Sequence, residues 1–260
     1  MTARIDAISA VSFYVRTDGS DGNNGLTNDA SGAFRTPQAA INNLYNNYDM
    51  RGFAASIRLS DGDFDPFSVI GTLQGSNNTT PLSVIGNTAT PGNVRIAPSS
   101  GQCVSNLRSV LFVSGMKLST TGAGGAIFGN EFGETTWANV EFGAVGGSHV
   151  FSAAHHVVAP TGAYTISGGA KVHWHITGYS QLFSTVAVTL TNTPNFSSEF
   201  LGMNTARATL IGTTFSGAAT GVRHLIHYNS YVETGGKEPA NYLPGNAAGS
   251  VDGGTFSLWS

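Results

Sequence analysis

Charged side chains are scarce in this sequence. They make up 10% of its 260 residues, against about 25% in an ordinary globular domain, and only three are lysines, at positions 117, 171 and 237. The formal net charge is −3 and the pI is about 6.1, so the chain lacks the broad basic surface that nucleic acids bind. We therefore expect no nucleic-acid partner.

Cysteine and long apolar runs are also lacking. The single Cys103 excludes an intrachain disulfide and a multi-cysteine metal site, and we interpret it as a small buried residue. No run approaches the roughly 20 apolar residues that span a bilayer, and residues 1–10 lack the apolar stretch of a signal peptide. We expect no cofactor, no membrane insertion, and synthesis in a cytoplasm.

Residues that favour turns and exposed strand positions are abundant instead. Glycine occurs 34 times, about twice its usual share, and Asn, Ser and Thr supply most of the polar surface. The 40% of hydrophobic residues, with 15 phenylalanines, are enough for a core. From residue 56 onward, short runs of alternating apolar and polar residues are separated by Gly, Asn, Pro or Ser. This pattern predicts an all-β chain.

Similar segments recur at intervals of about 20 to 30 residues, the range typical of stacked coils. Residues 115–118 resemble 139–142, and residues 191–196 resemble 210–215. We predict a parallel β-solenoid in which Met116, Val140 and Phe142 form one inward column. A jelly-roll β-sandwich is the alternative, because it is also built from short strands and turns.

One helix is predicted, over residues 36–47. Thr36 can cap its N-terminus, and Pro37 suits the first helical position. Apolar residues recur inside it at helical spacing, at Ala40, Ile41, Leu44 and Tyr45. No helix is predicted after residue 56.

Both ends of the chain resemble a known group of proteins. The segments FYVRTDGSDGNNGL (13–26) and AFRTPQAAI (33–41) resemble the beginning of pectate-lyase-like right-handed parallel β-helices. The tail NYLPGNAAGS (241–250), followed by Gly253 and Gly254, is similar to the C-terminus of many phage and prophage structural β-helix proteins. The resemblance implies a right-handed parallel β-helix that a short N-terminal helix caps, in a virion protein that forms homotrimers.

The resemblance also suggests a division of the chain. We expect residues 1–12 to be an anchoring arm, residues 13–234 to be the β-helix, and residues 235–260 to be an extended tail that packs on the helix or on a neighbouring subunit. The expected function is structural, as a bacteriophage fibre, spike or capsid decoration that contacts other virion proteins and host surface polysaccharide. The candidate oligomer contacts are the apolar tail residues Tyr242, Leu243, Phe256, Leu258 and Trp259.

A polysaccharide-degrading tailspike is the alternative function, and it requires a pair of carboxylates. The candidates are Asp61, Asp63 and Asp65, which alternation would place on one face, and Glu141, which should point outward between Val140 and Phe142. A solvated turn or an ordinary surface glutamate explains the same residues. No arginine or lysine is evident near Glu141, so the non-catalytic interpretation is favoured. A carbohydrate-binding module without cleavage is a third hypothesis.

Aromatic and histidine residues supply the remaining candidates. Tyr164, Trp174 and Tyr179 could stack on sugars, although aromatic side chains inside the coils are the commoner arrangement. His173 and His175 would share one face of a strand, where three pairs in a trimer could surround a metal. The simpler interpretation is two polar residues beside a packed Trp174, so we expect no metal.

Overall fold

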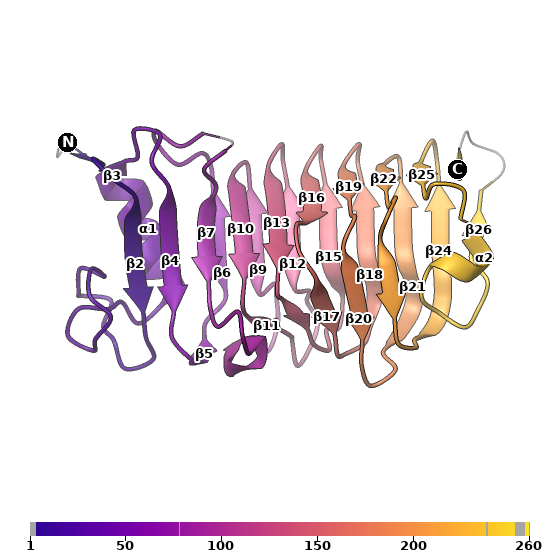
Figure 1. Cartoon of the computed structure of the whole chain (residues 1–260), viewed down its shortest axis with the longest axis horizontal. Helices are drawn as coiled ribbons and strands as arrows, with labels where there is room; N and C mark the ends of the chain where they lie inside the picture. Colours follow the sequence, from indigo (N-terminus) through magenta and orange to yellow (C-terminus); the bar gives the residue numbers. More distant parts are fainter. Residues whose placement is uncertain (1–3, 78, 238, 253–257, 260) are drawn as a thin grey trace.

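The chain folds into an elongated parallel β-solenoid of about eight turns (Figure 1). The computed structural model describes residues 4–77, 79–237, 239–252 and 258–259. Every strand pair among these residues is parallel, whereas a jelly roll is built from antiparallel strands. The prediction of a solenoid is confirmed, and the sandwich alternative is wrong.

Three parallel sheets run along the solenoid, and each full coil visits them in the order I, II, III. Sheet I contains β2 (Val11–Val15), β4 (Ala55–Leu59), β7 (Leu82–Ile85), β10 (Val110–Ser114), β13 (Glu134–Ala138), β16 (Val157–Pro160), β19 (Gln181–Phe183), β22 (Arg207–Thr209), β25 (Tyr231–Glu233) and β27 (Leu258–Trp259). Sheet II contains β5 (Gly62–Phe64), β8 (Val94–Ile96), β11 (Lys117–Leu118), β14 (Glu141–Phe142), β17 (Tyr164–Ile166), β20 (Ala187–Leu190) and β23 (Thr214–Ser216). Sheet III contains β6 (Phe67–Ile70), β9 (Val104–Leu107), β12 (Ile127–Asn130), β15 (Ser148–Ala153), β18 (Ala170–Thr177), β21 (Asn195–Asn204), β24 (Thr220–His227) and β26 (Ser250–Val251).

The strand register tests the predicted repeats. After the first coil, paired residues of sheet I are 23 to 29 positions apart. Residues 115–118 do stack on 139–142, with Leu118 paired to Phe142. Met116 and Val140 are both buried, two residues before Leu118 and Phe142 respectively. They form one column, and Phe142 belongs to a different one. The match of 191–196 with 210–215 is wrong, because Phe196 lies in sheet III and Phe215 in sheet II.

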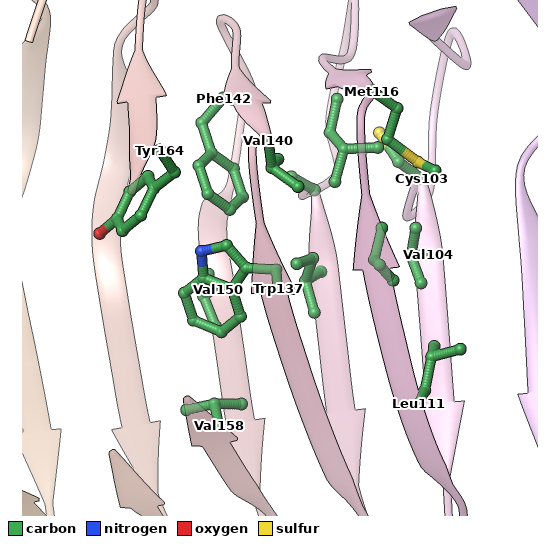
Figure 2. Close-up of a cluster of buried hydrophobic side chains, with 14 of the residues drawn as sticks. Cys103, Val104, Leu111, Met116, Trp137, Val140, Phe142, Val150, Val158 and Tyr164 are labelled. Atoms are coloured by element: carbon green, nitrogen blue, oxygen red, sulfur yellow. The ribbon is translucent and has the colours of Figure 1, made fainter. Parts of the chain in front are cut away.

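The core lies between the three sheets and consists of the inward residues of every coil. Figure 2 shows Trp137, Phe142 and Tyr164 within it. The Trp137 ring meets those of Phe142 and Tyr164 edge-on, with centroids 6.1 and 5.9 Å apart. Cys103 is also fully buried, and burial raises the pKa of its thiol to about 12. It is the small core residue that the sequence suggests.

The predicted helix is α1 (Pro37–Asn47), and it replaces the second and third sheets in the first coil (Figure 1). The Thr36 hydroxyl accepts a hydrogen bond from the Ala39 backbone N–H at 3.2 Å. Asp21, from the preceding glycine-rich loop, accepts from the Thr36 backbone N–H and hydroxyl, both at 2.8 Å. The buried face of α1 includes Ile41 and Leu44. The cap, the loop and the apolar face together explain why the helix forms here.

Several short elements accompany the three sheets. β1 (Ile5–Asp6), within the expected anchoring arm, pairs with β3 (Tyr48–Asp49), and the 3₁₀ helix η1 (Pro91–Asn93) precedes β8. α2 (Pro239–Tyr242) is a single turn in a Pro/Gly-rich segment, too short to give a periodic signal in the sequence. No helix among the described residues is long and apolar enough to cross a membrane.

The tail residues can be followed in part. The Tyr242 hydroxyl donates to the carbonyl oxygens of Leu210 (2.7 Å) and Thr213 (3.1 Å), and Leu243 is buried. Both residues therefore pack on their own solenoid. Leu258 and Trp259 form the last strand of sheet I, and Phe256 lies outside the described residues. Contacts of these residues with another subunit stay a prediction.

Candidate functional site

Asp63 lies in β5, Asp61 and Asp65 flank this strand, and all three are exposed. Asp61 accepts hydrogen bonds from the side-chain amides of Asn87 (2.9 Å) and Asn93 (2.8 Å). Asp63 forms a bidentate ion pair with Arg95 of the next coil, at 2.5 and 2.8 Å. The hydrogen bonds from Arg95 lower the pKa of Asp63, so its carboxylate is a poor proton donor at neutral pH.

Glu141 is the outward residue of β14 and is partly buried. Its Oε1 accepts hydrogen bonds from Lys117 Nζ at 2.7 Å and from Ser167 Oγ at 2.5 Å. Partial burial raises the pKa of Glu141, but these two hydrogen bonds and the Lys117 charge outweigh it, and the pKa lies below its ordinary value. The expectation of no cation near Glu141 is wrong, because Lys117 lies one coil away and 24 residues earlier.

Asp63 and Glu141 are too far apart to act as a glycosidase pair. Asp63, Arg95, Lys117 and Glu141 occupy successive positions of one outward row on sheet II. Three strand spacings separate the first from the last, about 14 Å, whereas the catalytic carboxyl groups of glycosidases are roughly 5 to 9.5 Å apart. Asp65 lies beside Asp63, Arg95 and Lys117 around a shallow hollow of about 480 Å³. The ion pairs of this row join neighbouring coils.

The two candidate metal ligands do not share a face. His173 is fully buried among core rings, while His175 is partly exposed and packs on Phe151, with ring centroids 5.0 Å apart. Regular alternation fails because the register of β18 against β21 shifts near Val172, and Val172, His173 and Trp174 are buried in succession. The described residues contain no group of three or more His, Cys, Asp or Glu that could hold a metal ion.

His173 belongs to a buried chain of hydrogen bonds that joins two coils. The Gly143 carbonyl accepts from His149 Nε2 (2.9 Å), so Nδ1 of the neutral His149 ring accepts from His173 Nδ1 (3.0 Å). His173 Nε2 then accepts from the Tyr164 hydroxyl (2.9 Å). Burial lowers the pKa of His149 to about 4 and also lowers that of His173. Every ring nitrogen is engaged in a neutral network, which leaves none for a metal.

The three aromatic candidates also separate. Tyr164 and Trp174 are buried, so neither can serve as a platform for a ligand. Tyr179 is 65% exposed and lies in the turn between β18 and β19. The expectation that aromatic side chains of this chain lie mostly inside the coils holds for the first two, and Tyr179 is the candidate that remains.

Tyr179 is the last ring of an exposed stack, which we call the aromatic ladder: Phe132, His155 and Tyr179. The Phe132 and His155 ring centroids are 4.8 Å apart with planes 12° from parallel, and those of His155 and Tyr179 are 5.3 Å apart at 21°. All three residues have left-handed backbones, with φ of 52°, 66° and 64°, a conformation uncommon for residues other than glycine. The turns from sheet III to sheet I thus hold one ring per coil outward.

A cavity of about 330 Å³ follows the ladder along the solenoid. It begins at Tyr179 and continues past Thr205 and Arg207 to Asn229 and Tyr231. The Arg207 guanidinium lies 5.5 Å from the centre of the Tyr231 ring and forms an ion pair with Glu233 at 3.5 Å. An aromatic face, an amide and an oriented cation therefore surround one hollow, and this is the candidate binding site.

Comparison of the chain with protein-family models, with curated proteins and with solved structures found no match. The geometry and chemistry of the side chains therefore carry the functional argument.

The sequence holds a signal for the ladder that composition alone does not reveal. Phe132, His155 and Tyr179 follow one another at intervals of 23 and 24 residues, the length of one coil in this part of the solenoid. Once a coil length is known, rings at that interval predict a stack on one edge. Arg207 and Asn229 carry no such signal. The turn at 205–206, which separates both from Tyr179 in the sequence, is shorter than the turn at 178–180 and breaks the interval.

Proposed function

We propose that this chain is a structural protein of a bacteriophage virion, a β-solenoid subunit of a fibre, spike or capsid decoration. The observation that carries the proposal is the use of the outward charges. Asp63 is neutralised by Arg95 and Glu141 by Lys117, each across neighbouring coils. Residues in this arrangement hold coils together and are poorly placed for acid–base catalysis. The similarity of the tail to phage structural proteins supports the same function.

We further propose that the subunit forms a homotrimer, contacts other virion proteins, and meets the polysaccharide of a host surface. The aromatic ladder and its cavity support the last of these, because exposed stacked rings beside polar groups are typical of recognition surfaces. The solenoid geometry supports a rigid spacer, since the coils between the two ends are paired with their neighbours along all three sheets.

The proposal is tested on purified particles. An antibody against the chain, coupled to gold, should label the capsid or tail in electron micrographs, and light scattering of the purified protein should give three times the mass of the 26.9 kDa chain. A monomer in solution together with unlabelled particles would refute the virion assignment.

A polysaccharide-degrading tailspike is the second candidate, and the cation beside Glu141 is the observation that favours it. Lyases use a cationic side chain near the reacting carbon, and Lys117 lies 2.7 Å from Glu141. We expect the purified chain to leave host capsule and O-antigen preparations at full length in size-exclusion chromatography. If the parent chain shortened the polysaccharide and the Glu141→Gln variant left it at full length, the chain would be an enzyme instead.

A further inference from the structure

The hollow beside Tyr179 originates in a turn that is one residue short. Three residues separate the paired strand ends in the turns 131–133, 154–156, 178–180 and 228–230, but only two do so at 205–206, as also at 108–109 before the ladder. The longer turns contain two successive residues with positive φ, and the two short turns contain one each, Thr205 and Arg108. The coil of Thr205 therefore lacks the outermost turn residue, and the aromatic ladder lacks its next ring.

We propose that this missing position is a binding site for one pyranose ring of a polysaccharide. The coil that carries Tyr179 and the coil that carries Asn229 are two strand spacings apart, about 9.6 Å. A ring placed midway would lie about 4.8 Å from each coil, which is the spacing that already separates Phe132 from His155. The sugar would thus continue the ladder in place of a side chain.

The side chains around the hollow match the chemistry of a sugar. A pyranose ring has an apolar face of C–H groups, which stacks on an aromatic ring such as Tyr179, and a rim of hydroxyl groups. Asn229 and Gln181 line the hollow with amides that both donate and accept hydrogen bonds. Arg207 adds fixed donors, because Glu233 and the Tyr231 ring hold its guanidinium in place. A purely apolar ligand would leave these polar groups without partners.

Three residues that border the hollow share the left-handed backbone of the other turns on this edge of the solenoid. Tyr179, with a φ of 64°, and Asn229, with a φ of 46°, border the hollow from left-handed positions. Such conformations are costly for residues with a Cβ atom, roughly 1 kcal/mol each, and glycine would avoid the cost. Thr205, with a φ of 52°, is β-branched and is among the residues least suited to this conformation. These turns keep side chains where glycine would fold more easily.

This inference rests on the proposed function in one respect, namely that the sugar belongs to a bacterial surface. The test uses the isolated chain on an array of defined bacterial-surface oligosaccharides, so its outcome does not depend on whether the chain is found on particles. We expect retention of pyranose-containing glycans, and we expect Tyr179→Ala to weaken the strongest binding at least about tenfold in calorimetric titration. Retention of no glycan would overturn the inference.

Phe132→Ala is the matched control, because Phe132 is also an exposed ring of the same ladder, at 76% against 65% for Tyr179, but does not line the hollow. We expect its affinity to stay within about twofold of the parent chain, since no stacking contact with the sugar is lost. Equal losses for Phe132→Ala and Tyr179→Ala, or no loss for Tyr179→Ala, would overturn the assignment of the site.

A gain of one residue provides an independent test. Replacing Thr205 by the dipeptide Gly-Tyr, the sequence of the neighbouring turn at 178–179, should complete the ladder and close the hollow. We expect an unchanged melting transition and loss of glycan binding. A folded variant that binds as tightly as the parent chain would contradict a sugar in this position.

Discussion

At the scale of single residues, the buried chain from Tyr164 through His173 to His149 connects two coils through polar contacts inside an apolar core. The Gly143 carbonyl can only accept, so His149 must carry its proton on Nε2. The direction of the other two hydrogen bonds then follows. That fixed direction makes the network intolerant of losing any member. An exposed ring such as Tyr179 has no comparable role in stability.

Removal of one hydroxyl tests this network. Tyr164→Phe leaves His173 Nε2 as a buried acceptor without a donor, which costs about 1 to 3 kcal/mol. We expect urea unfolding to show a loss of this size. Tyr179→Phe, which removes an exposed hydroxyl, should change the free energy of unfolding by less than about 0.5 kcal/mol. Equal effects of the two changes would contradict the network.

The buried histidines also predict how stability depends on pH. Burial lowers the pKa of both His149 and His156 from 6.5 to about 4, so below pH 6.5 the unfolded chain binds protons that the native chain does not. The free energy of unfolding should therefore fall between pH 6.5 and 4, by up to about 1.4 kcal/mol per pH unit for each histidine. Glu199, whose pKa burial raises, opposes this trend because its native carboxyl gains the proton first.

Urea unfolding at several values between pH 7.5 and 4.5 measures this slope. A free energy of unfolding that stays constant across the range would show that the buried rings are not held neutral.

At the scale of elements, α1 depends on its first turn. Thr36→Ala removes the hydroxyl that accepts from the Ala39 backbone N–H and donates to Asp21, and loss of such a cap costs about 1 kcal/mol. We expect the melting temperature to drop by a few degrees. Thr90→Ala should have no such effect, because the Thr90 side chain makes no capping bond to η1. Similar losses in both variants would contradict a capping role for Thr36.

The elements also show what the sequence could and could not reveal. Helix α1 and the alternating strands follow from local signals, and residues 115–118 matched 139–142 because they lead into equivalent short strands of sheet II, β11 and β14, in neighbouring coils. The second match failed because its interval of 19 residues is shorter than one coil, so it joined a segment that enters sheet III to one in sheet II. A register irregularity in β18 placed His173 inside. Irregularities and turn lengths depend on contacts between coils, which one sequence does not display.

The candidate site divides in the same way. The sequence singled out Tyr179 correctly as a possible platform, but it also singled out Tyr164 and Trp174, which are buried. It missed Arg207 and Asn229, because they border the hollow only through the short turn at 205–206. The Lys117–Glu141 ion pair was also missed, since a separation of 24 residues places two side chains together only when the coil length is known.

At the scale of the whole molecule, each coil is supported by the coils before and after it, so stability should vary along the axis. We expect hydrogen exchange to be slowest in the central strands β13 to β18 and fastest in β1, β3 and β26. The end strands are short and have fewer neighbours. Mass spectrometry of exchanged peptides measures this profile. Uniform protection from end to end would indicate a single cooperative unit instead.

The short turn at 205–206 has a consequence for how such a chain can diversify. Because all three sheets continue unbroken past it, the removal of one residue at a turn alters the outline of a single edge and leaves the pairing of every strand intact. A solenoid can therefore acquire, shift or lose a notch on its surface through one codon, at any coil, without redesign of its interior. The outline of the surface and the scaffold are therefore separable in this architecture, because a turn can change while the core and the strand pairing stay the same.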